Sequence, residues 1–249
     1  MRDLLFLMFV LLLSASGFAQ LLELRETASA HFKIQFGSDY DDDEVEMVGS
    51  ELELAYRLLN QKYGLKVQKK LPVYLTSSEV SYNRKVPVRE RWGAAYSNRT
   101  LYFQPMSYIR KNGGLRITVR HALAFAMLRP IVASGCPPWL ARSFAVNFSG
   151  EMEILSKPSQ TRIKFFTDLN EVLEEARGLP DLETSYYTAG LAVRYFEERF
   201  GSRKVADLIK SFDGRSLDNQ VKEKVFGLPF NDLQYEWVQY VDRRINASQ

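Results

Sequence analysis

The pattern of apolar residues changes near residue 112, and this change constrains the fold more than any other feature of the sequence. Before it, strand-like and helical segments alternate. After Asn112-Gly113-Gly114, apolar residues recur at helical spacing almost to the end of the chain. Strands in the first part and helices in the second are typical of an α+β protein. We therefore expect an α/β lobe over residues 20–112 and a helical lobe over residues 113–249.

The first lobe contains recognisable strands and one long helix. Residues 31–36 alternate polar and apolar side chains as a half-buried strand does, and residues 71–76 predict a second strand. Between them, an acidic run opens a helix that we expect to continue from about residue 39 to Gly64. Residues 77–91 are mixed and indicate a loop or short helix. Two short apolar runs around a polar turn predict a hairpin over residues 93–104.

The second lobe is expected to consist of helices separated by glycine and proline. Apolar residues and His121 share one face of a helix over residues 115–128, which Pro130 is expected to end. A short helix follows over residues 139–148, with Pro138 well placed at its start. The remaining helices are predicted near residues 168–177, 184–199, 202–211, 216–225 and 229–245.

The first 19 residues indicate a signal peptide. A short charged start precedes ten apolar residues, Leu4–Leu13, and Gly17-Phe18-Ala19 forms a small-x-small cleavage signal. The alternative is a membrane anchor, but ten residues are fewer than the roughly 20 that span a bilayer. We expect a mature chain of residues 20–249 that is periplasmic or extracellular. No later segment is apolar enough to span a membrane, so no stable membrane span is expected after signal removal.

The charge of the chain argues against one class of partner, and its cysteine content excludes one source of stability. The chain has 33 Lys and Arg against 30 Asp and Glu, a net charge of +3. This well-mixed charge argues against nucleic acid, because binding phosphates requires a concentrated basic face. The single cysteine, Cys136, cannot form an internal disulfide, so stability must come from the core. Cys136 is either a small buried residue or a partner for another chain.

Three segments together resemble a known protein family. They are the strand beginning His31-Phe32-Lys33-Ile34, the helical run His121-Ala122-Leu123-Ala124-Phe125, and the segment Pro137-Pro138-Trp139-Leu140-Ala141-Arg142. The chain resembles the peptidase MA-like group of zinc metallopeptidases, the gluzincins. This resemblance covers most of the mature chain. It implies a zincin-like fold, with a twisted mixed sheet in the first lobe and a helical second lobe.

The residues that carry zinc chemistry in that family are mostly replaced here. The family's helix carries H-E-x-x-H, in which two His bind zinc and the Glu acts as general base. By resemblance, His121 matches the first His, Ala122 the general base, Phe125 the second His and Arg142 the third ligand. Alanine cannot accept a proton, phenylalanine has no donor atom, and arginine is permanently cationic. The resemblance therefore implies no catalytic residue, no metal and no cofactor.

Three alternatives remain open at these positions. His121 is either a core histidine paired with a neighbour or a residual metal or proton-transfer group. Arg142 either holds a carboxylate or peptide carbonyl in the family's cleft or is a surface residue. A zinc site made by His121, Cys136 and a carboxylate is conceivable, although no known spacing supports it.

The functional hypothesis that follows is an exported pseudoenzyme that binds a protein or peptide. The family's cleft lies beside an edge strand, and a retained edge can accept an extended peptide without zinc. Two other hypotheses are an active zinc hydrolase with atypical ligands and a structural subunit of an envelope assembly. The partner is accordingly expected to be an extended peptide or an envelope protein. The candidate binding residues, in the 93–104 hairpin and the later helix, are Ala95, Tyr96, Ser97, Leu101, Tyr102 and Arg142.

Overall fold

The structure is a computed structural model, and it describes most of the chain after residue 23. The described residues are 24–86, 93–132, 137–159, 165–166, 168–169, 173, 179–211 and 224–246. The predicted signal peptide and Cys136 therefore lie outside the described residues.

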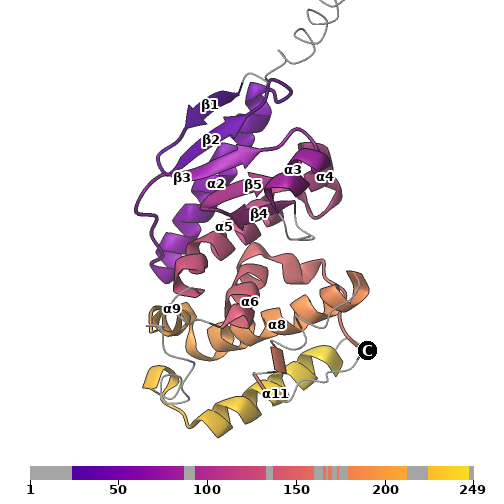
Figure 1. The fold of residues 1–249 in the computed structure, drawn as a ribbon. Helices are drawn as coiled ribbons and strands as arrows, with labels where there is room; N and C mark the ends of the chain where they lie inside the picture. Colours follow the sequence, from indigo (N-terminus) through magenta and orange to yellow (C-terminus); the bar gives the residue numbers. More distant parts are fainter. Residues whose placement is uncertain are drawn as a thin grey trace, which may run out of the picture.

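A five-stranded mixed sheet forms the upper part of the molecule in Figure 1. The three central strands are parallel to one another, and an antiparallel strand lies at each edge. In spatial order the strands are β1 (Arg25–Ala28), β2 (Phe32–Phe36), β3 (Leu71–Leu75), β5 (Thr100–Phe103) and β4 (Ala94–Ser97).

The two predicted strands and the predicted hairpin are present. The hairpin turns at Asn98 and Arg99, whose φ angles of 47° and 62° are the positive values that a tight two-residue turn requires. Strand β1 was not predicted from the sequence. It lies at the sheet edge with most of its side chains exposed, so its residues show no apolar alternation.

The long helix α2 covers one face of the sheet. Helix α2 (Asp42–Tyr63) begins where the Asp41 side chain accepts a hydrogen bond from the backbone N–H of Glu44 at 2.6 Å, and it ends at Gly64. Its buried face meets Ile34 and other inward side chains of the sheet. On the opposite face, the short helix α3 (Glu79–Lys85) places Tyr82 in a small second cluster with Ala95.

The helical part lies below the sheet in Figure 1 and is joined to it through helix α5. Helix α5 packs against α2 and the sheet on one side and against α6 on the other, and α6 packs against α8. The sheet region ends with α4 (Met106–Lys111), and the later elements are α5 (Gly114–Val132), α6 (Pro138–Ser149), the 3₁₀ turn η1 (Glu151–Glu153), α8 (Leu179–Phe200), α9 (Ser202–Lys210) and α11 (Phe230–Asn246).

The helix predicted over residues 115–128 was expected to end at Pro130, and this prediction is wrong. Helix α5 continues to Val132, with Pro130 inside its last turn. Two residues of the helix follow Pro130, so the proline lies close to the helix end. Helices α8, α9 and α11 confirm three of the later predictions, whereas most of the segments 168–177 and 216–225 lie outside the described residues.

Glu197 joins the two parts of the molecule. Its carboxylate lies on α8 and accepts hydrogen bonds from Lys62 and Tyr63 at the end of α2. It also accepts one from the Asn147 amide of α6, at 2.8 Å. Beside these contacts, the Tyr63 ring meets Phe144 with 4.6 Å between ring centroids. Polar and apolar contacts thus fix α2 to the helical part.

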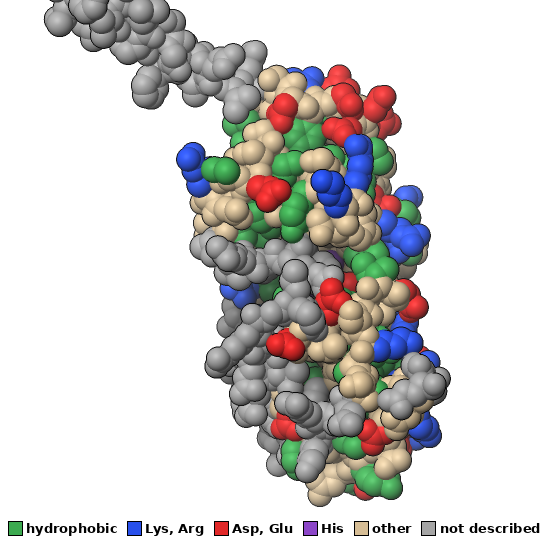
Figure 2. All heavy atoms as spheres, turned by 90° about the vertical axis from the view of Figure 1, so that its right-hand side faces the viewer, with side chains coloured by type: hydrophobic (Ala, Val, Ile, Leu, Met, Phe, Trp, Pro, Cys, Tyr) green, Lys and Arg blue, Asp and Glu red, His purple; other side chains and the backbone are tan. Residues whose placement is uncertain are grey.

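Charged side chains of both signs are spread over the face shown in Figure 2, and acidic ones gather at the end of the sheet region farthest from the helical part. Within the part of the chain that the structure describes, every helix is too short or too polar to cross a bilayer.

Candidate functional site

His121 lies in the middle of α5 and is almost fully buried. Its ring is 5% exposed, and Nδ1 lies 2.7 Å from Oε2 of Glu151, which has no exposed surface. The Ser149 hydroxyl lies 3.5 Å from the same carboxylate oxygen. The Tyr186 ring of α8 meets the imidazole edge-on. The contact between His121 and Glu151 links α5 to the turn that follows α6. It also gives the buried imidazole the hydrogen-bond partner that buried polar groups normally have.

The other positions of the family pattern contribute no polar group to this cluster. Ala122 is buried in the main core, and Phe125 is half-buried against it. Arg142 is half-buried on α6. The alternative of a paired core histidine thus fits the surroundings of His121.

Glu151 is the partner of His121 that the sequence did not predict. The family pattern placed the third position at Arg142, nine residues earlier in the chain. Glu151 follows Gly150, whose φ of 79° ends α6 and starts the 3₁₀ turn. A glycine-ended helix followed by a carboxylate is too common to indicate a buried partner for His121.

The described residues do not fit the catalytic zinc that members of the resembled family carry. A catalytic zinc needs three protein ligands, and the printed contact at His121 joins its imidazole to one carboxylate, that of Glu151. Among the described residues, no group of three or more His, Cys, Asp or Glu could hold a metal ion. The conceivable site that includes Cys136 lies outside the described residues.

Strand β4 is an edge strand, and its hydrogen bonds show which of its residues pair with β5 and which point outward. The N–H of Gln104 donates to the Gly93 carbonyl at 2.7 Å, just beyond the paired residues Ala94 and Phe103. Hydrogen-bonded and non-hydrogen-bonded pairs alternate along an antiparallel ladder. The main-chain groups of Ala94 and Tyr96 therefore point away from β5, and no described strand pairs with them.

The candidate residues in the hairpin do not form one binding surface. Leu101 has no exposed surface and Ala95 is 2% exposed, so neither side chain can contact a ligand in this conformation. Tyr96 packs towards the main core, whereas Tyr102 packs on the opposite face of the sheet with Tyr82. What the hairpin offers is its main chain, with Tyr96 and Ser97 half-buried beside it.

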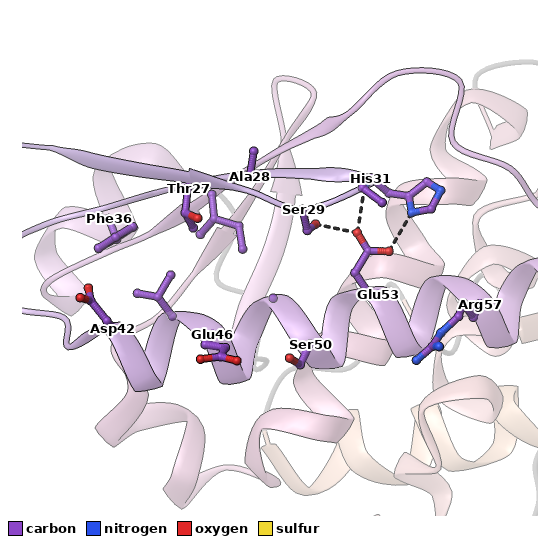
Figure 3. Close-up of a pocket in the computed structure, with 14 residues that line it drawn as sticks. Thr27, Ala28, Ser29, His31, Phe36, Asp42, Glu46, Ser50, Glu53 and Arg57 are labelled. Carbon is purple, nitrogen blue, oxygen red and sulfur yellow. Dashed lines mark hydrogen bonds and ion pairs between the residues drawn. The ribbon is translucent and has the colours of Figure 1, made fainter.

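A groove of about 800 Å³ lies between the first two strands and α2, as Figure 3 shows. Its floor is apolar and includes Ile34 and Val45. At one end Glu53 accepts hydrogen bonds from the Ser29 hydroxyl at 2.6 Å and the His31 N–H at 2.8 Å. The His31 ring adds a third contact, with Nδ1 2.7 Å from Glu53. These contacts clamp the β1–β2 turn to α2.

The fold is similar to that of several solved structures, among them the M1 zinc metallopeptidase from Deinococcus radiodurans, with a TM-score of 0.46 and 15% sequence identity. The match covers 87% of this chain and 51% of that chain, so this chain spans about half the length of the matched structure. The sequence matches no protein-family model and no curated protein.

The buried pair generates a stability prediction. Replacing His121 by Leu leaves the Glu151 carboxylate buried without its imidazole, which we expect to lower the free energy of unfolding by about 3–5 kcal/mol. The double variant H121L/E151L removes both polar groups and is expected to recover part of this loss. Urea unfolding of the three proteins measures the difference. A single variant as stable as the wild type would show that the pair contributes nothing.

The clamp at Glu53 generates a pH prediction. Burial alone would raise the pKa of Glu53, but hydrogen bonds from Ser29 and His31 lower it below its ordinary value. A carboxyl whose pKa is lower in the folded than in the unfolded state stabilises the fold at any pH above its unfolded-state pKa. This stabilisation is lost as the pH falls through the folded-state pKa. E53Q should therefore unfold more easily by about 1 kcal/mol near neutral pH, and this difference should shrink as the pH falls below the ordinary pKa of a glutamate. A difference in the free energy of unfolding that stays constant with pH would contradict the stabilisation of ionised Glu53 by Ser29 and His31.

Proposed function

We propose that this chain is an exported peptide-binding module on a zincin-like frame, and that it does not hydrolyse peptides. The observation that carries this proposal is the position of β4. It is an antiparallel edge strand whose outward main-chain groups are paired with no described strand. An extended peptide can add to such an edge through main-chain hydrogen bonds, and nearby side chains then set its specificity.

The position of helix α5 supports the zincin-like part of the proposal. This helix carries His121 and packs directly against β4. In the family that the sequence resembles, the metal-binding helix lies beside the edge strand of the sheet. The same juxtaposition here would place a bound peptide next to the segment where the zinc chemistry resides in those enzymes.

The residues of α5 support a binding role without catalysis. Ala122 is a buried alanine where a general base would stand, and it can accept no proton. His121 is held by Glu151 and surrounded by core side chains. A peptide bound at β4 would thus meet a helix that offers neither the base nor the ligand set of a zinc peptidase.

The remaining functional hypotheses differ from this one in what they require. An active hydrolase requires a third zinc ligand, and a structural envelope subunit requires no ligand at the sheet edge. The signal peptide over residues 1–19 would carry the mature chain to the periplasm or the cell exterior in each case.

Proline substitution at the edge strand tests the peptide site. The probe is the strongest-binding peptide selected from a random octapeptide library against the purified protein. Y96P removes the outward N–H of residue 96 without removing a hydrogen bond to β5, because this N–H points away from it. We expect Y96P to bind the probe at least tenfold more weakly, measured by fluorescence anisotropy.

The matched control is Y96A, which shortens the side chain and keeps the main-chain N–H. We expect Y96A to retain most of the affinity if main-chain pairing dominates. Equal binding by the wild type and Y96P would contradict the edge-strand site. Failure of the library to yield any peptide would contradict the binding function itself.

A further inference from the structure

A polar basin of about 520 Å³ lies between the 3₁₀ turn η1 and helices α8 and α11, in the helical part of the molecule. The most buried residues that line it are Met152 of η1 and Tyr187 of α8, which are 3% and 5% exposed. Charged side chains from η1, from the chain that follows it and from both helices stand around them. The basin therefore exists only where these separate elements pack together.

The hydroxyl of Tyr187 is a donor that lacks a partner. Among the residues that the structure describes, none forms a hydrogen bond with it, although the side chain is almost fully buried. Burial raises the pKa of Tyr187 above its ordinary value, so the hydroxyl keeps its proton at neutral pH, whereas the guanidinium groups of Arg194 and Arg244 act in the opposite direction. Both cations therefore lie close enough to the phenol oxygen to act on it. A buried donor beside two cations favours an acceptor that carries negative charge.

The charged lining of the basin has more cations than anions. Its cations are Lys157, Arg194 and Arg244, and its carboxylates are Glu153 and Glu198. Each carboxylate already faces a guanidinium, in the pairs Arg194–Glu153 at 3.0 Å and Arg244–Glu198 at 2.7 Å. Because three cations face two carboxylates, the positive charge that remains favours an anion as the ligand.

The guanidinium groups are held in place and keep donors for a further ligand. Arg194 uses Nη2 for Glu153, and no described residue accepts a hydrogen bond from its Nε or Nη1. Arg244 is held by both oxygens of Glu198 and by the Tyr240 ring, 5.1 Å from its centroid. A side chain that is already held loses little conformational freedom when a ligand binds. The Glu153 side chain is 71% exposed, so its ion pair contributes little and yields readily to an anion of higher charge.

We propose that this basin binds a dianionic phosphate group, as free phosphate or as a phosphate monoester. The Tyr187 hydroxyl and the guanidinium groups of Arg194 and Arg244 donate hydrogen bonds to its oxygens, and Lys157 adds positive charge. A tetrahedral dianion has acceptors in several directions, which suits donors that come from separate elements, whereas a carboxylate presents two oxygens in one plane. This site is separate from the β4 edge and does not depend on the proposed peptide function.

Inorganic phosphate, methyl phosphate, dimethyl phosphate and acetate are the probes that test this site. Each is titrated into the isotopically labelled protein at constant ionic strength, at a pH above the second pKa of phosphate, and amide shifts are followed by NMR. We expect saturable shifts centred on Met152, Tyr187 and Arg194 with the two dianions. The monoanions dimethyl phosphate and acetate should bind at least about threefold more weakly because they carry less charge.

The same titrations identify the source of the phosphate group. Tighter binding of inorganic phosphate would assign the site to free phosphate, and tighter binding of methyl phosphate would assign it to a monoester; either result supports the proposal. Equal binding of all four anions, or no saturable shift with any of them, would overturn it.

Substitutions in the basin separate binding from folding. Y187F removes only the hydroxyl and should weaken phosphate binding about fivefold. R194Q removes a charged donor and should weaken it at least about tenfold. E153Q removes a carboxylate that competes for Arg194 and should strengthen phosphate binding about threefold. A purely structural role of these residues does not produce tighter binding by E153Q.

The matched control is R199Q, which removes an arginine of the same helix outside the basin. Arg199 is also ion-paired, with Glu236 at 3.0 Å. We expect R199Q to bind phosphate as the wild type does. A loss with R199Q as large as with R194Q would mean that phosphate responds to the overall charge of α8 without a built site, and would overturn the proposal. Unchanged binding by both Y187F and R194Q would overturn it as well, because the basin would then not hold the anion.

Discussion

The burial of helix α5 on two sides is the constraint on which the rest of the structure depends. The helix packs against α2 and the sheet on one side and against α6 on the other. Its residues Val119, Leu123, Ala124 and Leu128 have no exposed surface. A helix in this position must be apolar around most of its circumference. A buried polar group on it costs free energy unless it finds a hydrogen-bond partner inside the molecule.

His121 meets this requirement through Glu151, and the pair accounts for the local structure after α6. The carboxylate reaches the imidazole because Gly150 ends α6 and the 3₁₀ turn folds back towards α5. Around this pair, α5 carries Ala122, which is buried in the main core, and Phe125, which is half-buried against it. Among the described residues, this pair lies inside the main core, whereas β4 lies at an edge of the sheet.

Much of the fold could be predicted because its signals are local. The alternation in 31–36, the glycine that ends α2 and the polar turn of the hairpin each report a nearby structural requirement. Strand β1 could not be found in this way, because an exposed edge strand is held by its neighbour's main chain and needs no apolar pattern. Pro130 misled for the opposite reason, since a strong local signal was overridden by packing of the helix around it.

The candidate site was less predictable than the fold. Position-by-position comparison with a family pattern identified His121 and the loss of its usual neighbours, but it could not identify Glu151, which belongs to no motif. It also selected Leu101 and Ala95 as contacts, although both side chains are buried, Leu101 in the main core and Ala95 under Tyr82 on the opposite face of the sheet. The groove beside α2 depends on small residues at Thr27 and Gly49, whose shared position is visible only once β1 is paired with β2.

The zinc content of the purified protein, measured after zinc loading and desalting, tests the central claim most directly. That claim is the proposal that the chain binds a peptide without metal chemistry, for which the pairing of buried His121 with Glu151 is one support. The account predicts that no stoichiometric zinc is retained. Retention of about one zinc per chain would contradict it, since a catalytic or structural zinc requires at least three protein ligands that the described residues do not bring together.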